Sequence, residues 1–169
     1  PPSGITLRPY QLLCVVCALD EGAAGGPAGR IADVLASVRQ APDTPITLQC
    51  NAGEVFAYQD PGPADDTPEG GEFNTRRDLE VLYRLNLFPG CTLPARVLFH
   101  RVWATIDDVS GICGYPSVTS ECWRGCPRAA GGDYARGRRK GVEAVIPPRN
   151  EEEMKREKER MGAGGGGVG

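Results

Sequence analysis

The residues of this chain with the clearest capacity for chemistry are three cysteines in one short segment, residues 112–126. Cys113, Cys122 and Cys126 lie there, and the spacing of Cys122 and Cys126 around Trp123 can bring both sulfur atoms to one centre. Thiol clusters of this kind are typical of metal sites or of disulfides. The cysteine count and the redox compartment decide between the two.

Both considerations favour a metal. The 169 residues contain seven cysteines, which is few for a disulfide-dense secreted scaffold, and the odd number leaves at least one unpaired. The apolar stretch over residues 5–19 lacks a basic flank and a small-residue cleavage site, so we expect no secretory signal and a cytoplasmic location. In a reducing compartment, thiol clusters hold zinc or iron–sulfur centres more often than they form disulfides. Inert buried thiols and a disulfide are the alternatives.

The remaining cysteines carry weaker signals. Cys14 and Cys17 form a C-x-x-C pair in an apolar stretch that predicts a helix, and for Cys17 we favour a small buried thiol over a ligand. Cys50 ends a predicted strand, where a ligand and a buried thiol fit the pattern equally well. The sequence assigns no role to Cys91.

His100 is the only histidine, and we interpret it as a packed or exposed residue of a helix. A single histidine excludes a Cys2His2 site and leaves a Cys3His site as an alternative. A cysteine nucleophile needs a base, which only His100 would supply, so we predict no catalysis.

The composition excludes several classes of function. A hydrophobic content of 40% is enough for an ordinary core, while 23 glycines and 15 prolines predict many loops. The formal net charge of -3 argues against general nucleic-acid binding. No apolar run approaches the roughly 20 residues that a membrane helix needs, so we expect a soluble chain.

Hydrophobic periodicity predicts a mostly helical chain with a short β-hairpin. A proline suits the first turn of a buried helix over residues 9–19. Residues 29–40 place apolar side chains at i, i+3, i+4 and i+7, which predicts an amphipathic helix. Two short strands at 46–50 and 54–59 flank an Asn-Ala-Gly turn and predict the hairpin.

Two more helices are predicted before the cysteine-rich segment. The first begins at a cap formed by Thr75 and Asp78, and the second spans residues 92–106. The residues expected to face inward are Leu79, Leu82 and Tyr83 in the first helix and Leu98, Val102 and Ile106 in the second.

Charged segments surround this predicted core. We interpret residues 60–72 as a solvated acidic loop, because their spacing lacks the ligand alternation of a calcium-binding EF-hand. A basic stretch is interpreted as a solvated helix face, with binding of a phosphate or an acidic partner as the alternative. Asn150 and Glu153 resemble the cap of a charged helix with little apolar surface, and we expect this tail to dock on a protein partner. The basic stretch comprises Arg124, Arg128, Arg136, Arg138, Arg139 and Lys140.

Four motifs follow one another in a recognisable order. They are Leu-Arg-Pro-Tyr-Gln-Leu-Leu-Cys at 7–14, Ala-Pro-Asp-Thr-Pro-Ile at 41–46, Arg-Asp-Leu-Glu-Val-Leu-Tyr-Arg-Leu-Asn-Leu-Phe-Pro-Gly at 77–90, and Ile-Cys-Gly followed by Cys-Trp-x-x-Cys at 112–126. Together they resemble the uncharacterised cysteine-rich prokaryotic family known as domain of unknown function 1284. The chain departs from that pattern at Tyr10 and Gln11, where the family has paired histidines, and near residues 54–61, which replace a central Asp-x-Cys-x-x-Cys-Pro motif.

The resemblance implies an iron–sulfur protein. Position by position, it marks Cys14, Cys113, Cys122 and Cys126 as the cofactor-binding metal ligands. Four thiolates are what a [4Fe–4S] cluster requires, or zinc as the alternative. Trp123 would shield the centre from water. Without the central pair, either Cys50 or Cys17 substitutes as a ligand, or the chain has kept the fold and lost the metal.

We therefore predict an α+β domain over residues 5–146, mostly helical with a short β-hairpin, followed by the tail at 147–169. The predicted function is metal binding without catalysis, in electron transfer or as an accessory subunit of a larger complex. The alternative is a metal-free interaction protein held by its tail and basic stretch. Convergence of Cys14 on the other predicted ligands would favour the metal.

Overall fold

The computed structural model describes residues 3–20, 29–50, 71–115 and 125–163. Helices dominate these ranges and accompany a small three-stranded sheet, which confirms the predicted α+β class. In chain order the elements are β1 (Ile5–Leu7), α1 (Pro9–Cys17), α2 (Gly29–Gln40), β2 (Pro45–Leu48), α3 (Gly71–Leu85), β3 (Thr92–Pro94), α4 (Ala95–Thr105), α5 (Pro127–Ala130), α6 (Asp133–Arg138), the 3-10 helix η4 (Val142–Ala144) and α7 (Glu151–Ala163).

The sheet joins strands that lie far apart in the sequence. β2 is the central strand, parallel to β1 and antiparallel to β3, so that Ile46 faces Ile5 on one side and Leu93 on the other. Both edges of β2 are therefore occupied, which differs from the predicted hairpin. The second predicted hairpin strand, 54–59, lies outside the described residues. Local turn residues indicated a strand at β2 but could not identify its distant neighbours.

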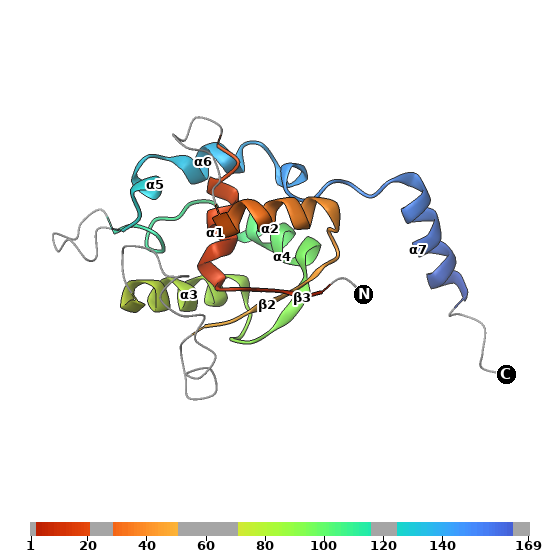
Figure 1. Ribbon diagram of the computed structural model, residues 1–169, viewed down its shortest axis with the longest axis horizontal. Coiled ribbons are helices and arrows are strands. Elements are labelled where there is room, and N and C mark those ends of the chain that lie inside the picture. The colour runs from red at the N-terminus through yellow and green to blue at the C-terminus, as the bar shows by residue number, and fades with distance from the viewer. Residues whose placement is uncertain (1–2, 21–28, 51–70, 116–124, 164–169) are drawn as a thin grey trace.

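Helix α1 forms the centre of the molecule and packs against α2, α3, α4 and α6 (Figure 1). A helix that is apolar on all sides is expected to be buried all round. Pro9 occupies the first turn as predicted, and the Oε1 atom of Gln11 accepts a 2.9 Å hydrogen bond from the Arg8 N–H. The side chains of α1 that are at most 1% exposed include Leu12, Leu13, Val15 and Val16.

Helices α2 and α4 have the apolar faces that the periodicity predicted. In α2 the buried residues are Val34, Leu35 and Val38. In α4 they include Leu98 and Val102, and Ile106 just beyond the helix is also buried. The predicted start of α4 is different, because Thr92–Pro94 pair with β2 as strand β3 before the helix begins.

Helix α3 corrects two predictions. It begins at Gly71, so Thr75 and Asp78 lie inside the helix rather than at its cap. Leu82 is 2% exposed as expected, but Leu79 and Tyr83 are 44% and 81% exposed. The reason is that the buried face follows Asp78, Val81, Leu82 and Leu85, an i, i+3, i+4, i+7 stripe with a buried carboxylate as its first member. Leu79 and Tyr83 project from the other side.

Helix α7 begins at the predicted cap and lies at one side of the molecule (Figure 1). The Glu153 N–H donates to Asn150 Oδ1 at 2.8 Å, and the Asn150 N–H donates to Glu153 Oε2 at 3.2 Å, which together form a capping box. The helix has no buried residue. Over the described ranges, no helix has both the length and the apolar character needed to cross a membrane.

Candidate metal centre

Helix α1 places two cysteines next to each other. Cys14 and Cys17 are three residues apart in its last turns, a spacing that puts both side chains on one helix face. Both are partly exposed, whereas their neighbours Val15 and Val16 are fully buried. One side of an otherwise buried helix therefore presents two thiols.

Two more cysteines are held together by a backbone pairing. The Cys126 N–H donates a 2.8 Å hydrogen bond to the Cys113 carbonyl oxygen, and Gly114 forms a bridge with Gly125. Gly125 has φ +96°, and a Cβ atom at this position would collide with the Cys113 carbonyl. Glycine is therefore required for the two cysteine segments to approach so closely.

The two pairs meet at one small cavity, which we call the cysteine cavity. Cys14, Cys17, Cys113 and Cys126 all line it. Its volume is about 30 Å³, which is room for one or two water molecules. The other residues that line it are two arginines and three apolar residues: Arg77, Arg128, Leu13, Val109 and Ala129.

Three of the four predicted ligands thus line one cavity. Cys14 comes from α1, while Cys113 and Cys126 come from the loops before α5. The fourth predicted ligand, Cys122, and the shielding residue Trp123 lie outside the described residues. Cys17 also lines the cavity, although the sequence favoured a purely structural thiol there. The C-x-x-C spacing was the signal that pointed to it.

The environment keeps the α1 thiols protonated when no metal is bound. Burial raises the pKa of Cys14 to about 12, and the nearby Cys113 and Cys126 raise it further, against the opposing effect of Arg77 and Arg128. Burial and the same neighbouring thiols also raise the pKa of Cys17 far above its usual value. A nucleophilic cysteine needs a lowered pKa. These two thiols are therefore poor nucleophiles at neutral pH.

The only histidine does not take part in this site. His100 is exposed on α4 and is not among the residues that line the cysteine cavity. This position argues against both alternatives that depended on it, the Cys3His site and the cysteine nucleophile with a histidine base.

A buried polar network adjoins the cysteine cavity through Arg77. Asp78 accepts hydrogen bonds from Arg8 Nε and from the Tyr10 N–H, each at 2.9 Å. The guanidinium of Arg77 stacks on the Tyr10 ring at 3.8 Å from the ring centroid and also lines the cavity. Tyr10 and Gln11, where the chain departs from the resembled motif, thus have structural roles here. This network was not predicted from the sequence, because Asp78 was expected at a helix cap.

The donor set fits a thiophilic metal in chemistry, although the thiols are not arranged as a finished coordination shell. Cysteine sulfur is the preferred ligand of zinc and of iron–sulfur clusters, and two guanidinium groups can balance the negative charge of several thiolates. Among the described residues, no group of three or more His, Cys, Asp or Glu side chains is placed so that it could hold a metal ion. Metal binding here requires the thiols to rearrange around a common point.

Comparison with known proteins does not identify the function of the site. No protein-family model, no curated protein and no solved structure matches this chain.

The other two described cysteines lie in the hydrophobic core. Cys50, after β2, is 0% exposed, and Cys91, before β3, is 6% exposed. Neither is among the residues that line the cysteine cavity. Their positions suit small buried side chains.

At least three of the five residues of the basic stretch that the structure describes are engaged in ion pairs, and Arg124 lies outside the described residues. Arg128 Nε contacts Asp133 Oδ2 at 2.8 Å, and Arg136 pairs with Asp20 at 2.7 Å and with Asp133 at 2.9 Å. Arg138 pairs with Asp107 at 2.8 Å. These guanidinium groups connect α5 and α6 to the rest of the fold.

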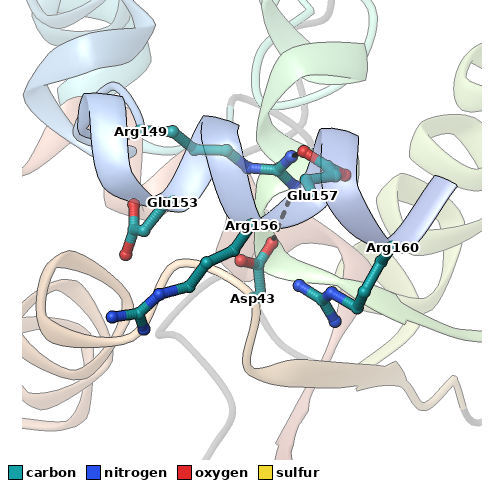
Figure 2. A pocket seen from close by; sticks show the side chains of 6 residues that line it. All are labelled: Asp43, Arg149, Glu153, Arg156, Glu157 and Arg160. Carbon is teal, nitrogen blue, oxygen red and sulfur yellow. Dashed lines mark hydrogen bonds and ion pairs between the residues drawn. The ribbon is translucent and has the colours of Figure 1, made fainter. Parts of the chain in front are cut away.

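A second cavity, of about 200 Å³, lies between α7 and the turn before β2, and we call it the α7 cavity (Figure 2). Arg149 pairs with Asp43 at 3.7 Å and also with Glu157. The described lining residues are three arginines and three carboxylates, so their formal charges cancel: Arg149, Arg156, Arg160, Asp43, Glu153 and Glu157. This balance favours a contact that holds α7 over a site for an anionic ligand.

Proposed function

We propose that this chain is a metal-binding protein without catalysis of its own, and that the cysteine cavity binds an iron–sulfur cluster. The role that follows is electron transfer or service as an accessory subunit of a larger complex. The observation that carries the proposal is the meeting of cysteines from α1 and from the segments around Cys113 and Cys126 at one cavity. Structural core thiols, such as Cys50, are not expected to line one common cavity.

The charge balance supports an anionic centre. A cluster with thiolate ligands carries net negative charge, which is costly to bury unless positive groups lie close by. Arg77 and Arg128 line the same cavity, and Asp133 positions the guanidinium of Arg128. When bound, the cluster supplies one-electron redox chemistry, while these arginines and the apolar lining influence its potential.

Structural zinc is the second candidate, and the size of the cavity favours it. A volume of about 30 Å³ suits a single ion, whereas a cubane cluster requires the cavity to widen. Zinc binding would make the centre a fold-stabilising site, because binding free energy at such a site is also folding free energy.

The metal-free alternative rests on the surface. Tyr83 and Phe88 are 81% and 68% exposed at and beyond the end of α3, and α7 buries no residue. Exposed apolar residues of this size are typical of a protein-binding surface. An accessory subunit would use such a surface whether or not the cysteine cavity holds a metal.

The deciding experiment is to purify the full chain without oxygen and to measure iron, zinc and acid-labile sulfide together with the visible spectrum. We expect iron and sulfide in near-equal amounts with broad brown absorption. Zinc alone would identify the second candidate. Protein that contains neither metal, and that takes up neither on reconstitution, would exclude metal binding and leave the accessory subunit.

A pair of cysteine variants tests whether the cavity is the binding site. Cys126→Ala should lower both the metal content and the melting temperature, because the site loses a ligand. Cys91→Ala is the matched control, since this cysteine lies in the core away from the cavity. Equal metal content in both variants would place the metal elsewhere.

A further inference from the structure

We propose that Cys17 is a ligand of the metal in the cysteine cavity, and that it completes a four-thiolate set with Cys14, Cys113 and Cys126. The inference rests on the proposed function and changes its ligand set. The resemblance to the cysteine-rich family assigned the fourth position to Cys122. The structure brings a fourth thiol to the cavity without it.

The geometry of α1 supports the pairing of Cys17 with Cys14. Their i, i+3 spacing directs both sulfur atoms towards the same side of the helix, where both line the cavity. Cys113 and Cys126 line the same cavity. Cys17 therefore shares a cavity with three of the predicted ligands and is not merely a neighbour of Cys14 in sequence.

The end of α1 is also held firmly in place. Gly137 of α6 packs directly on the backbone of Val16, and a Cβ atom on this glycine would collide with the Val16 carbonyl oxygen. Contact between the two backbones leaves the residue before Cys17 no room to shift towards α6. A preorganised helix turn lowers the cost of bringing two thiols to one ion.

Charge compensation extends to Cys17 as well. Arg128 lines the cavity together with Cys17 and Cys14. Asp133 holds this guanidinium through a 2.8 Å contact. An arginine in this position stabilises a thiolate at Cys17 once a metal has displaced its proton.

The competing substitutes are less suitable. Cys50 was the other cysteine that the sequence offered as a replacement ligand, but it is fully buried in the core and does not line the cavity. Cys91 does not line the cavity either. Of the described cysteines outside the predicted set, Cys17 is thus the one at the site.

The test titrates the metal-free full chain with Co²⁺ and then displaces it with Zn²⁺, because the thiolate-to-cobalt charge-transfer absorption reports the number of bound thiolates. We expect wild-type protein to bind through four thiolates. Cys17→Ser should lose one thiolate's share of the absorption and at least about tenfold in affinity, while Cys122→Ser should match wild type. Loss in Cys122→Ser with retention in Cys17→Ser, or equal losses in both, would overturn the assignment.

A second measurement avoids variants that fail to fold. Wild-type protein, with and without Zn²⁺, is treated with an alkylating reagent and the modified cysteines are mapped by mass spectrometry. Zn²⁺ should protect Cys17 and leave the labelling of Cys122 unchanged, and the reverse pattern would overturn the inference. If wild-type protein bound neither Co²⁺ nor Zn²⁺ nor an iron–sulfur cluster, the proposed function itself would fail. If it bound metal without involving Cys17, only the present inference would fail.

Discussion

The cysteine cavity and the α7 cavity differ in how their charged groups are solvated and neutralised. The cysteine cavity lies beside the buried helix α1 and is lined by four protonatable thiols, two guanidinium groups and apolar side chains. The α7 cavity lies at the surface, where three arginines and three carboxylates already neutralise one another. A charged group is costly to bury in the cysteine cavity, whereas the charged groups of the α7 cavity are well solvated.

This difference indicates where function and stability reside. A metal that displaces thiol protons in the cysteine cavity would gain strong bonds in a poorly solvated site and would join three chain segments, namely α1 and the segments around Cys113 and Cys126. Exposed ion pairs such as those of α7 contribute about 0–1 kcal/mol each. Perturbations near the cysteine cavity should therefore have much larger effects than perturbations near α7.

The largest expected effect is that of a methyl group at the contact between α1 and α6. Gly137→Ala should lower the free energy of unfolding by about 3 kcal/mol or more, because the added carbon meets the backbone of Val16 and cannot be accommodated by a side-chain rotation. Chemical denaturation measures the change. The control is Gly162→Ala in α7, where nothing lies within 4 Å of the added carbon and no loss is expected. Similar losses of unfolding free energy in both variants would contradict the expected difference between the two regions.

Buried charge near the cysteine cavity should make stability depend on pH. Burial raises the pKa of Asp78 from 3.8 to about 6, against the lowering effects of Arg8 and of the Tyr10 N–H. Between these values the folded protein holds a proton that the unfolded chain releases, so the contribution of Asp78 to stability falls as the pH rises from 4 to 7.

The unfolding free energy of wild type minus that of Asp78→Asn should accordingly fall by roughly 2–3 kcal/mol as the pH rises from 4 to 7. Denaturation at several pH values measures it for both proteins. A difference that stays constant, or that rises with pH, would show that the ion pair with Arg8 outweighs burial.

A guanidinium at the cysteine cavity should affect metal binding. Arg128→Gln should weaken zinc affinity by about tenfold, because it removes a positive charge beside several thiolates. Arg136→Gln is the matched control, since Arg136 also pairs with Asp133 but is not among the residues that line the cavity. Competition with a chelator measures both affinities. Equal effects would mean that Arg128 acts only through the fold.

The smallest effect is expected at the α7 cavity. Arg149→Ala removes contacts with Asp43 and Glu157 but should change the free energy of unfolding by less than about 1 kcal/mol. Limited proteolysis of the region around α7 should show the change better than global denaturation. A large loss of stability would mean that α7 is an integral part of the core.

Much of the helical framework could be predicted from local patterns. The stripe of α2, the buried side of α4, the proline at the start of α1 and the capping box of α7 all occur where the sequence indicated. These features depend on residues within a few positions of one another, and helix geometry alone relates such positions. The inward face of α3 was mispredicted because its stripe includes Asp78, a charged residue whose burial depends on Arg8, 70 positions away in the chain.

What the sequence by itself determined is the chemistry on offer: seven cysteines, one histidine and segments of helix that carry some of those thiols. Only the tertiary structure decided which thiols share a cavity. It brought Cys17 to Cys113 and Cys126, left Cys50 in the core and placed Arg77 and Arg128 beside the sulfur atoms. The physical reason is that such groupings arise from long-range packing, here from glycines that let backbones touch at Gly125 and Gly137.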